Sequence, residues 1–140
     1  MEGGKVTCRF KFRLVKHLIT FPAYVNGRGP FDFWLDTGGP GLMLRKALAE
    51  ELSLKIVDAG KRGIGAGGEV PILVTTVGSF EFGGLRLENI RAHVLELKGM
   101  DEKFGHRFYG CVGYGILKDF KVCIDYPNRE VMLIKPLENT

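Results

Sequence analysis

An Asp-Thr-Gly tripeptide at residues 36–38 is the part of this sequence best suited to chemistry. It follows an apolar run at residues 31–35, which predicts a β-strand that ends at Asp36. A carboxylate held at the end of a rigid strand can act as a general base and activate a water molecule. The Thr37 hydroxyl would fix the turn, and Gly38 would leave room for a substrate. The tripeptide therefore predicts a water-activating site centred on Asp36.

The elements expected to position this site are mostly short strands. Alternating apolar residues, bounded by turn residues, predict strands at residues 6–16, 18–25, 31–35, 70–77, 80–82, 85–87, 90–97, 110–113, 122–126 and 131–134. Turns are predicted at residues 26–30, at Gly83-Gly84 and around Pro127. Leucines at positions 44, 48 and 52 predict one amphipathic helix within residues 42–54. Residues 98–107 are expected to form a surface loop, and residues 116–120 a short helical turn.

The composition indicates a single globular domain that spans residues 1–140. This length is enough to bury one real core and is short for two. Hydrophobic residues make up 45% of the chain and charged residues 26%, which is an ordinary balance for a globular protein. The 20 glycines and ten phenylalanines, together with many β-branched residues, favour a β-rich chain and argue against a helical bundle.

The formal charge of +4 is scattered along the chain. Arg9, Lys11 and Arg13 alternate with apolar residues, a pattern typical of the solvent face of a half-buried strand. We therefore expect no nucleic-acid partner. The sequence contains no run of 18 apolar residues, so we expect no membrane partner either.

The three cysteines, Cys8, Cys111 and Cys123, form no CxxC pair, and their odd number argues against a closed disulfide framework. We expect reduced, mostly buried thiols and a cytoplasmic location. Cys111 is better explained as a buried structural thiol than as a nucleophile paired with His106, because it lies in an apolar run.

No metal or other cofactor is expected, because the spacing of His17, His93 and His106 matches no metal site that includes the cysteines. The glycine-rich residues 63–68 match the pattern GxGxxG, which in dinucleotide-binding proteins leads from a strand into a helix. Here Pro71 and a β-rich run follow instead. This context favours a flexible hairpin over a dinucleotide site.

Taken together, several motifs in order resemble those of the retropepsin-like aspartyl proteases, in particular the single-domain aspartyl-protease-like proteins of bacteria and archaea. The resemblance covers most of the chain. The matching motifs are the Asp-Thr-Gly tripeptide, its lead-in at residues 25–30, the glycine-rich residues 63–68, Gly83-Gly84-Leu85, Cys111-Val112-Gly113 before a helical turn, and Ile124-Asp125-Tyr126-Pro127. The resemblance implies a mainly β, retropepsin-like acid-protease fold: a closed, barrel-like domain with one clear α-helix and a short second helical turn.

The same resemblance implies an aspartic endopeptidase whose substrate is a peptide or protein. Its chemistry needs two carboxylates that share one proton. This chain offers one, so the implied active form is a homodimer with one Asp36 from each chain. The implied site residues are catalytic Asp36, the active-site loop residues Thr37, Gly38 and Gly39, the flap residues Gly63, Ile64, Gly65, Ala66, Gly67 and Gly68, and the supporting second motif Cys111, Val112 and Gly113.

The chain departs from the family pattern after the tripeptide. Relatives usually have Ala or Ser where this chain has Gly39, which is followed by Pro40 and Gly41. Tyr109 and Gly115 stand where relatives often carry aspartates. These departures keep open a second hypothesis, in which the chain is a non-catalytic retropepsin-like module that binds peptides or dimerises.

Overall fold

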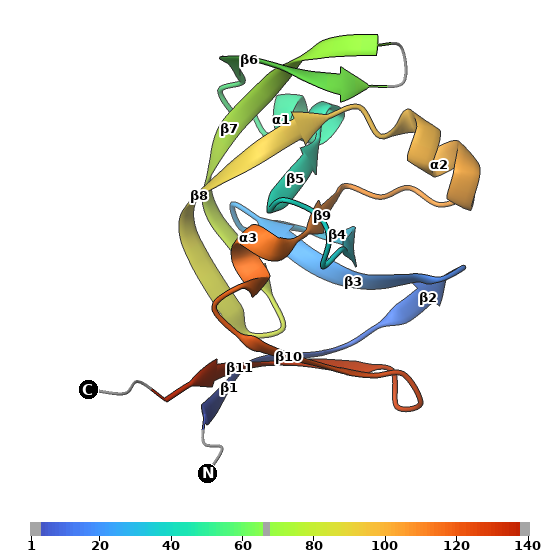
Figure 1. Ribbon diagram of the computed structural model, residues 1–140, viewed down its shortest axis with the longest axis vertical. Coiled ribbons are helices and arrows are strands. Elements are labelled where there is room, and N and C mark those ends of the chain that lie inside the picture. Colours follow the sequence, from blue (N-terminus) through green and yellow to red (C-terminus); the bar gives the residue numbers. More distant parts are fainter. Residues whose placement is uncertain (1–3, 66–67, 138–140) are drawn as a thin grey trace.

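A strongly curved mixed sheet forms most of the molecule (Figure 1). The computed structural model describes residues 4–65 and 68–137, and within them the strands of this sheet lie in the order β2-β3-β4-β9-β5-β8-β7-β6. A further pairing of β3 with β7 closes part of the sheet into a barrel-like ring. The strands are β2 (Arg13–Val15), β3 (Leu18–Val25), β4 (Arg28–Leu35), β5 (Leu42–Arg45), β6 (Val57–Gly65), β7 (Gly68–Phe82), β8 (Leu85–Leu95) and β9 (Gly110–Val112). The expected mainly β, barrel-like fold is confirmed.

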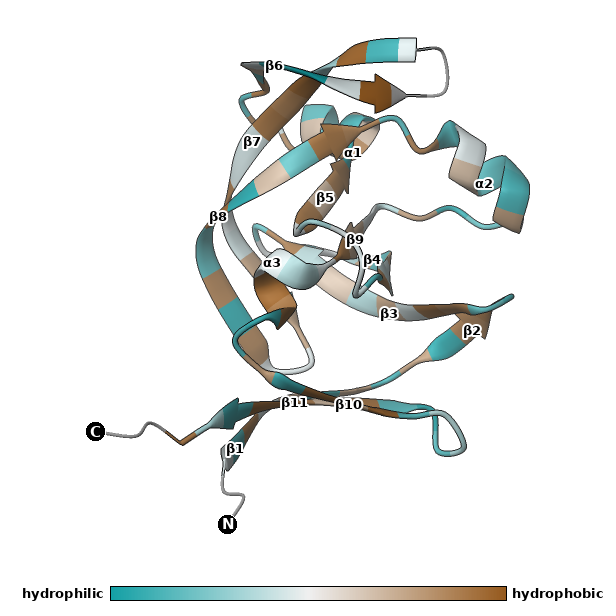
Figure 2. Ribbon diagram, viewed as in Figure 1, coloured by the Kyte–Doolittle hydropathy of each residue, from teal (hydrophilic) through white to brown (hydrophobic). Residues whose placement is uncertain are grey.

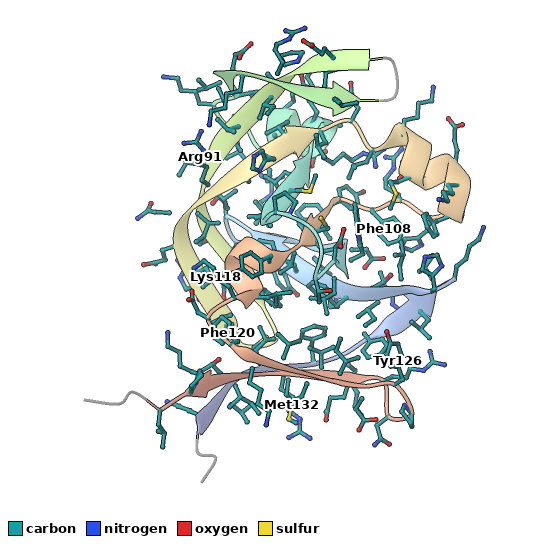
Figure 3. All side chains as sticks on the ribbon, in the orientation of Figure 1. Arg91, Phe108, Lys118, Phe120, Tyr126 and Met132 are labelled. Carbon is teal, nitrogen blue, oxygen red and sulfur yellow. The ribbon has the colours of Figure 1, made fainter. Side chains whose placement is uncertain are left out.

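A second, three-stranded antiparallel sheet lies below the ring in Figure 1 and has the order β1-β11-β10. Its strands are β1 (Gly4–Lys11), β10 (Lys121–Asp125) and β11 (Glu130–Pro136). Alternation along β11 buries Val131 and Leu133 completely, and Met132 points away from the ring (Figure 3). This sheet therefore joins the two ends of the described chain and closes the core from below.

Three short helices complete the fold: α1 (Lys46–Glu51), α2 (Lys98–Phe104) and α3 (Tyr114–Leu117). The predicted helix over residues 42–54 is wrong in its first part, because Leu42–Arg45 forms β5. This strand pairs with β8 on one side and β9 on the other. Its ladder hydrogen bonds on both edges override the helical spacing of the leucines, and only α1 is helical.

The surface loop predicted at residues 98–107 is also wrong in part, because α2 occupies most of it. Gly105 ends this helix in the left-handed conformation, with φ at 63°. Phe104 is buried at the last turn. A polar, glycine-bearing segment thus becomes helical because tertiary contacts hold it, which local patterns do not reveal.

Several predicted element boundaries shift. The strand expected at residues 6–16 breaks at Phe12, whose N–H donates to Arg129 O. The turn expected at residues 26–30 is confined to Asn26-Gly27, and β4 already includes Pro30.

Other predicted strands are continuous in the structure. Residues 70–77 and 80–82 belong to one long strand, β7, and its partner β8 likewise spans two predicted strands. The Gly83-Gly84 hairpin between them is confirmed, whereas α3 begins and ends earlier than the turn predicted at 116–120.

Two hydrophobic clusters lie on opposite faces of β4, β9 and β5. Phe33, Leu35 and Val112 belong to the main core, whereas Trp34 and Cys111 belong to a smaller cluster that α2 and Phe108 cover. Bands of hydrophobic and hydrophilic residues accordingly alternate along the strands (Figure 2). The strand that leads to Asp36 is therefore packed on both faces. Within the described residues, the helices are all too short or too polar to cross a bilayer.

Candidate functional site

Asp36 directly follows β4, where that strand runs parallel to β9. The pairs Phe33–Gly110, Trp34–Cys111 and Leu35–Val112 fix the register of the two strands. One step further, the Asp36 N–H donates to Val112 O at 2.9 Å. The Asp36 side chain is half-buried, and Thr37 and Gly38 beside it are exposed. The predicted carboxylate is thus held by a strand buried on both faces and remains open to solvent.

The loop after Asp36 folds back around the carboxylate. The Gly39 N–H donates to Asp36 O at 2.9 Å, and the Gly38 N–H donates to Asp36 Oδ1 at 3.1 Å. A Cβ atom added to Gly39 would lie 3.3 Å from the Asp36 carboxyl carbon, which is a tight contact. The glycine that departs from the family pattern therefore permits a close turn around this side chain.

The second motif holds the Asp36 loop from behind. The Gly113 N–H donates to Gly41 O at 2.9 Å, the Tyr114 N–H to Gly39 O at 2.7 Å, and the Gly115 N–H to Pro40 O at 3.0 Å. A Cβ atom added to Gly113 would lie only 2.6 Å from Gly39 O. The two segments therefore touch through their backbones, and only glycine fits at position 113. The structure brings together the predicted loop residues and Cys111, Val112 and Gly113.

Cys111 is a packed thiol in this arrangement. Its Sγ lies 3.4 Å from Met43 Sδ, and the residue has no exposed surface. Burial, with a smaller contribution from the charge of Asp36, raises the pKa of the Cys111 thiol to about 12. The thiol is therefore protonated and unreactive at neutral pH. The suggested partner His106 instead contacts Asp32, with Nε2 2.8 Å from Oδ2. The interpretation of Cys111 as structural is supported.

The glycine-rich segment lies in the hairpin formed by β6 and β7. Gly63 pairs with Val70, Ile64 with Glu69, and Gly65 with Gly68, whereas the predicted flap residues Ala66 and Gly67 lie outside the described residues. Ile64 is 91% exposed. In Figure 1 this hairpin lies at the top of the view, apart from the Asp36 loop that joins β4 to β5. The segment joins two strands, which excludes the strand-to-helix geometry of a dinucleotide site.

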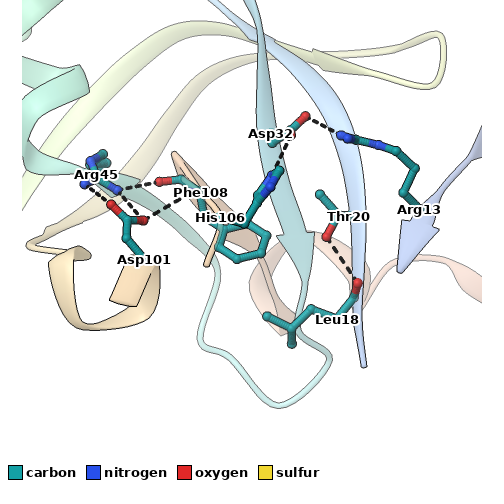
Figure 4. Close-up of polar contacts among 8 residues, drawn as sticks. All are labelled: Arg13, Leu18, Thr20, Asp32, Arg45, Asp101, His106 and Phe108. Carbon is teal, nitrogen blue, oxygen red and sulfur yellow. Dashed lines mark hydrogen bonds and ion pairs between the residues drawn. The ribbon is translucent and has the colours of Figure 1, made fainter. Parts of the chain in front are cut away.

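Two ionic networks that the sequence analysis missed anchor α2 and the segment after it (Figure 4). The buried Arg45 donates from Nη1 to Asp101 Oδ1 at 3.0 Å and to Phe108 O at 2.8 Å. The hydrogen bond from Arg45 holds the pKa of the Asp101 carboxyl below its usual value. In the second network, Asp32 accepts from Arg13 at 2.7 Å and contacts His106.

These networks hold α2 and the segment after it over the smaller hydrophobic cluster that contains Trp34 and Cys111. The Arg45–Asp101 pair joins residues 56 positions apart, and the His106–Asp32 pair joins residues 74 positions apart. No local pattern could have revealed either pair. A further residue that the sequence analysis missed is Tyr114, which is 60% exposed and whose backbone binds the Asp36 loop. In the sequence, the position of Tyr114 directly after Gly113 of the second motif could have indicated this role.

The described residues contain no group of three or more His, Cys, Asp or Glu side chains placed to hold a metal ion. The chemistry available at the site is that of a single carboxylate per chain. Asp36 is half-buried, follows a strand packed on both faces, and is followed by the exposed residues Thr37 and Gly38. Such a group can act as a general base toward water, or can share a proton with a second carboxylate brought by another chain.

Comparisons with known proteins agree with this description. Residues 21–117 match a family model described as aspartyl protease. The fold is similar to the crystal structure of a retropepsin-like aspartic protease from Rickettsia conorii, with a TM-score of 0.60 and 23% sequence identity. That match covers 93% of each chain. A search of curated proteins found no match.

Proposed function

The chain belongs to the aspartyl protease family, and on that premise we propose that it is a homodimeric aspartic endopeptidase with one catalytic Asp36 from each chain. The observation that carries the proposal is the placement of Asp36. Asp36 directly follows the buried strand β4, and its backbone N–H donates to Val112 O. Exposed loop residues lie beside its carboxylate. A rigid, accessible carboxylate is what activation of water requires.

Two copies of Asp36 would divide the chemistry between them. At the short separation of a shared site, like charges disfavour double ionisation, so one carboxyl keeps a proton. The ionised Asp36 would take a proton from water as the water attacks the peptide carbonyl carbon. The protonated Asp36 would donate to the carbonyl oxygen. The exposure of Thr37 and Gly38 supports this arrangement, because a second copy could approach Asp36 from that side.

Peptide would lie extended between the Asp36 loop and the β6–β7 hairpin. The hairpin supports this role through its exposed Ile64 and the outer edge of β6, which pairs only with β7 among the described strands. An extended peptide can add its backbone hydrogen bonds to such an edge. In this proposal Gly63, Ile64, Gly65 and Gly68 line one side of the peptide, and the exposed Gly38 lines the other.

A second candidate function is that of a peptide-binding or dimerisation module without catalysis. The specific observation that favours it is the Gly39-Pro40-Gly41 turn, which replaces the usual residues after the tripeptide. In this alternative the same surfaces bind peptide, but the two carboxylates do not reach a common water molecule.

The deciding experiment measures cleavage of a peptide library from acidic to neutral pH over a range of protein concentrations. We expect cleavage that rises with the square of protein concentration when the dimer is dilute. Asp36→Asn should reduce the rate by about 10³-fold or more, because the general base is lost. The matched control is Asp119→Asn, which removes an exposed carboxylate that pairs with its neighbour Lys118.

A mixing experiment tests whether two chains share the site. Excess Asp36→Asn protein added to wild type should suppress cleavage, because mixed dimers carry one carboxylate. Cleavage that is linear in concentration and insensitive to mixing would contradict the shared site. Peptide retention without cleavage by both proteins would favour the binding module.

A further inference from the structure

The pairing of β6 with β7 is irregular at the base of their hairpin. Asp58 pairs with Leu73, and the next pair is Arg62 with Pro71. Residues 59–61 of β6 therefore stand opposite the single residue 72 of β7, and they bulge away from it. Gly60, with φ at 75°, donates its N–H to Asp58 Oδ1 at 2.8 Å and stabilises the bulge.

A surface pocket of about 380 Å³ lies beside this bulge, between the start of β6 and the strands β7 and β8. Val57, Ala59 and Val74 give it an apolar wall. Lys55, Thr76 and Arg91 also line it, and Arg91 lies on the outer side of β8 (Figure 3). The pocket therefore combines a small apolar surface with two cations and two threonines, Thr75 and Thr76.

These polar groups come from three segments that the sheet fixes in place. Thr76 and Arg91 are directly paired between β7 and β8, so their side chains are neighbours on one face. The buried Thr75 donates its hydroxyl to Lys55 O at 2.7 Å and so ties the backbone of Lys55 to β7. The rim of the pocket is thus partly preorganised.

The charge of the pocket is uncompensated among the described residues. Its lining contains no Asp or Glu, and neither Lys55 nor Arg91 lies within ion-pair distance of a carboxylate in the described part of the chain. Many of the other arginines do, including Arg9, Arg45 and Arg86. Two such cations at one pocket favour an anion.

We propose that this pocket binds a small organic anion, with a phosphate or carboxylate group held by Lys55, Arg91 and the Thr76 hydroxyl. A compact apolar part of the ligand would pack on Val57 and Val74. The volume lies at the lower end of the range usual for small-molecule sites. The site is distinct from the Asp36 loop, and its existence does not depend on proteolysis. A bound anion would link the start of β6 to β8 and stiffen the base of the hairpin.

The test is an NMR titration of the amide spectrum with phenyl phosphate, with inorganic phosphate and benzoate as parallel arms, at ionic strength kept constant with sodium chloride. We expect saturable shifts confined to residues near positions 55–59, 74–76 and 91. Phenyl phosphate should bind more tightly than inorganic phosphate, and the benzoate arm distinguishes a carboxylate from a phosphate preference.

The double variant Lys55→Gln/Arg91→Gln should weaken binding at least tenfold. The control Arg28→Gln/Lys121→Gln removes the same charge from two exposed cations elsewhere and should retain binding. Repeating the titration on Asp36→Asn separates this proposal from proteolysis, because binding should persist there. Non-saturable shifts, equal binding in the double variant, or shifts spread over the surface would overturn the proposal. The amide spectrum of each variant shows in the same experiment that it is folded.

Discussion

The Asp36 loop and the β6–β7 hairpin are built in opposite ways. Four backbone hydrogen bonds join residues 36–41 to residues 112–115, and Gly113 leaves no space between the two segments. Among the described strands, β6 pairs only with β7, and Ile64 on β6 is 91% exposed. A segment with many packed contacts is rigid, whereas a segment with few contacts opens easily. The Asp36 loop is of the first kind and the hairpin of the second.

This difference matches two different demands of the proposed chemistry. A carboxylate must be held close to its productive geometry, because small displacements are costly to the rate. A segment that covers an extended peptide must admit substrates of different sequence and release products. Rigidity is therefore built where the proposed catalysis occurs, and exposure where the proposed peptide enters.

The substitution Gly113→Ala should disrupt the rigid region, the Asp36 loop. The new Cβ would lie 2.6 Å from Gly39 O, so the Asp36 loop must shift. We expect a loss of about 1–3 kcal/mol in the free energy of unfolding, measured by urea denaturation, and loss of most peptide cleavage. The control Gly99→Ala introduces a Cβ into open space in α2 and should keep stability within about 1 kcal/mol. Equal behaviour of the two variants would contradict the role given to Gly113.

The support behind the loop can be tested through Asp101. Its pairing with Arg45 should make Asp101→Asn less stable than wild type by about 1–3 kcal/mol at neutral pH. The folded pKa of Asp101 is lowered, so this contribution is fully present above the unfolded pKa, whose usual value is 3.8, and is lost as the pH falls through the folded pKa.

The difference between the two proteins should therefore shrink on acidification, as measured by thermal or urea unfolding at a series of pH values. Asp119→Asn, at an exposed pair, should show little difference at any pH. A wild-type advantage that persists unchanged in acid would show that Asp101 acts by packing alone.

The substitution Ile64→Ser tests the exposed side and should have the smallest effect on folding. Because the side chain is 91% exposed, we expect a change within about 0.5 kcal/mol in the free energy of unfolding. If the hairpin covers peptide, the lost apolar contact should lower kcat/KM about tenfold, as measured by peptide cleavage. Ile64→Val should retain most activity. A large loss of stability with unchanged cleavage would contradict both the small contribution of Ile64 to folding and the proposed role of the hairpin in covering peptide.

Much of the β structure could be predicted because it is encoded locally. The strand expected at residues 18–25 coincides with β3, and Gly83-Gly84 turns the chain as expected. The Asp-Thr-Gly tripeptide was identified from its residues at the end of an apolar run, and the second motif from the resemblance to retropepsin-like proteases. The failures occurred at β5, at α2 and at β6, a strand that was not predicted. At β5 the helical spacing of the leucines predicted a helix, whereas the segment pairs as a strand. The contacts that hold α2 come from residues far away in the chain.

The sequence by itself determined the β-rich character of the chain, the end of a strand at Asp36 and the resemblance to retropepsin-like proteases. These features depend on alternation, turn residues and short motifs, which act over a few neighbouring positions. Only the tertiary structure decided that Gly113 abuts Gly39, that Arg45 and Asp101 fix α2, and that Lys55 and Arg91 share a pocket. Each of these contacts joins residues from different elements, so it exists only once the sheet has closed and brought distant segments together.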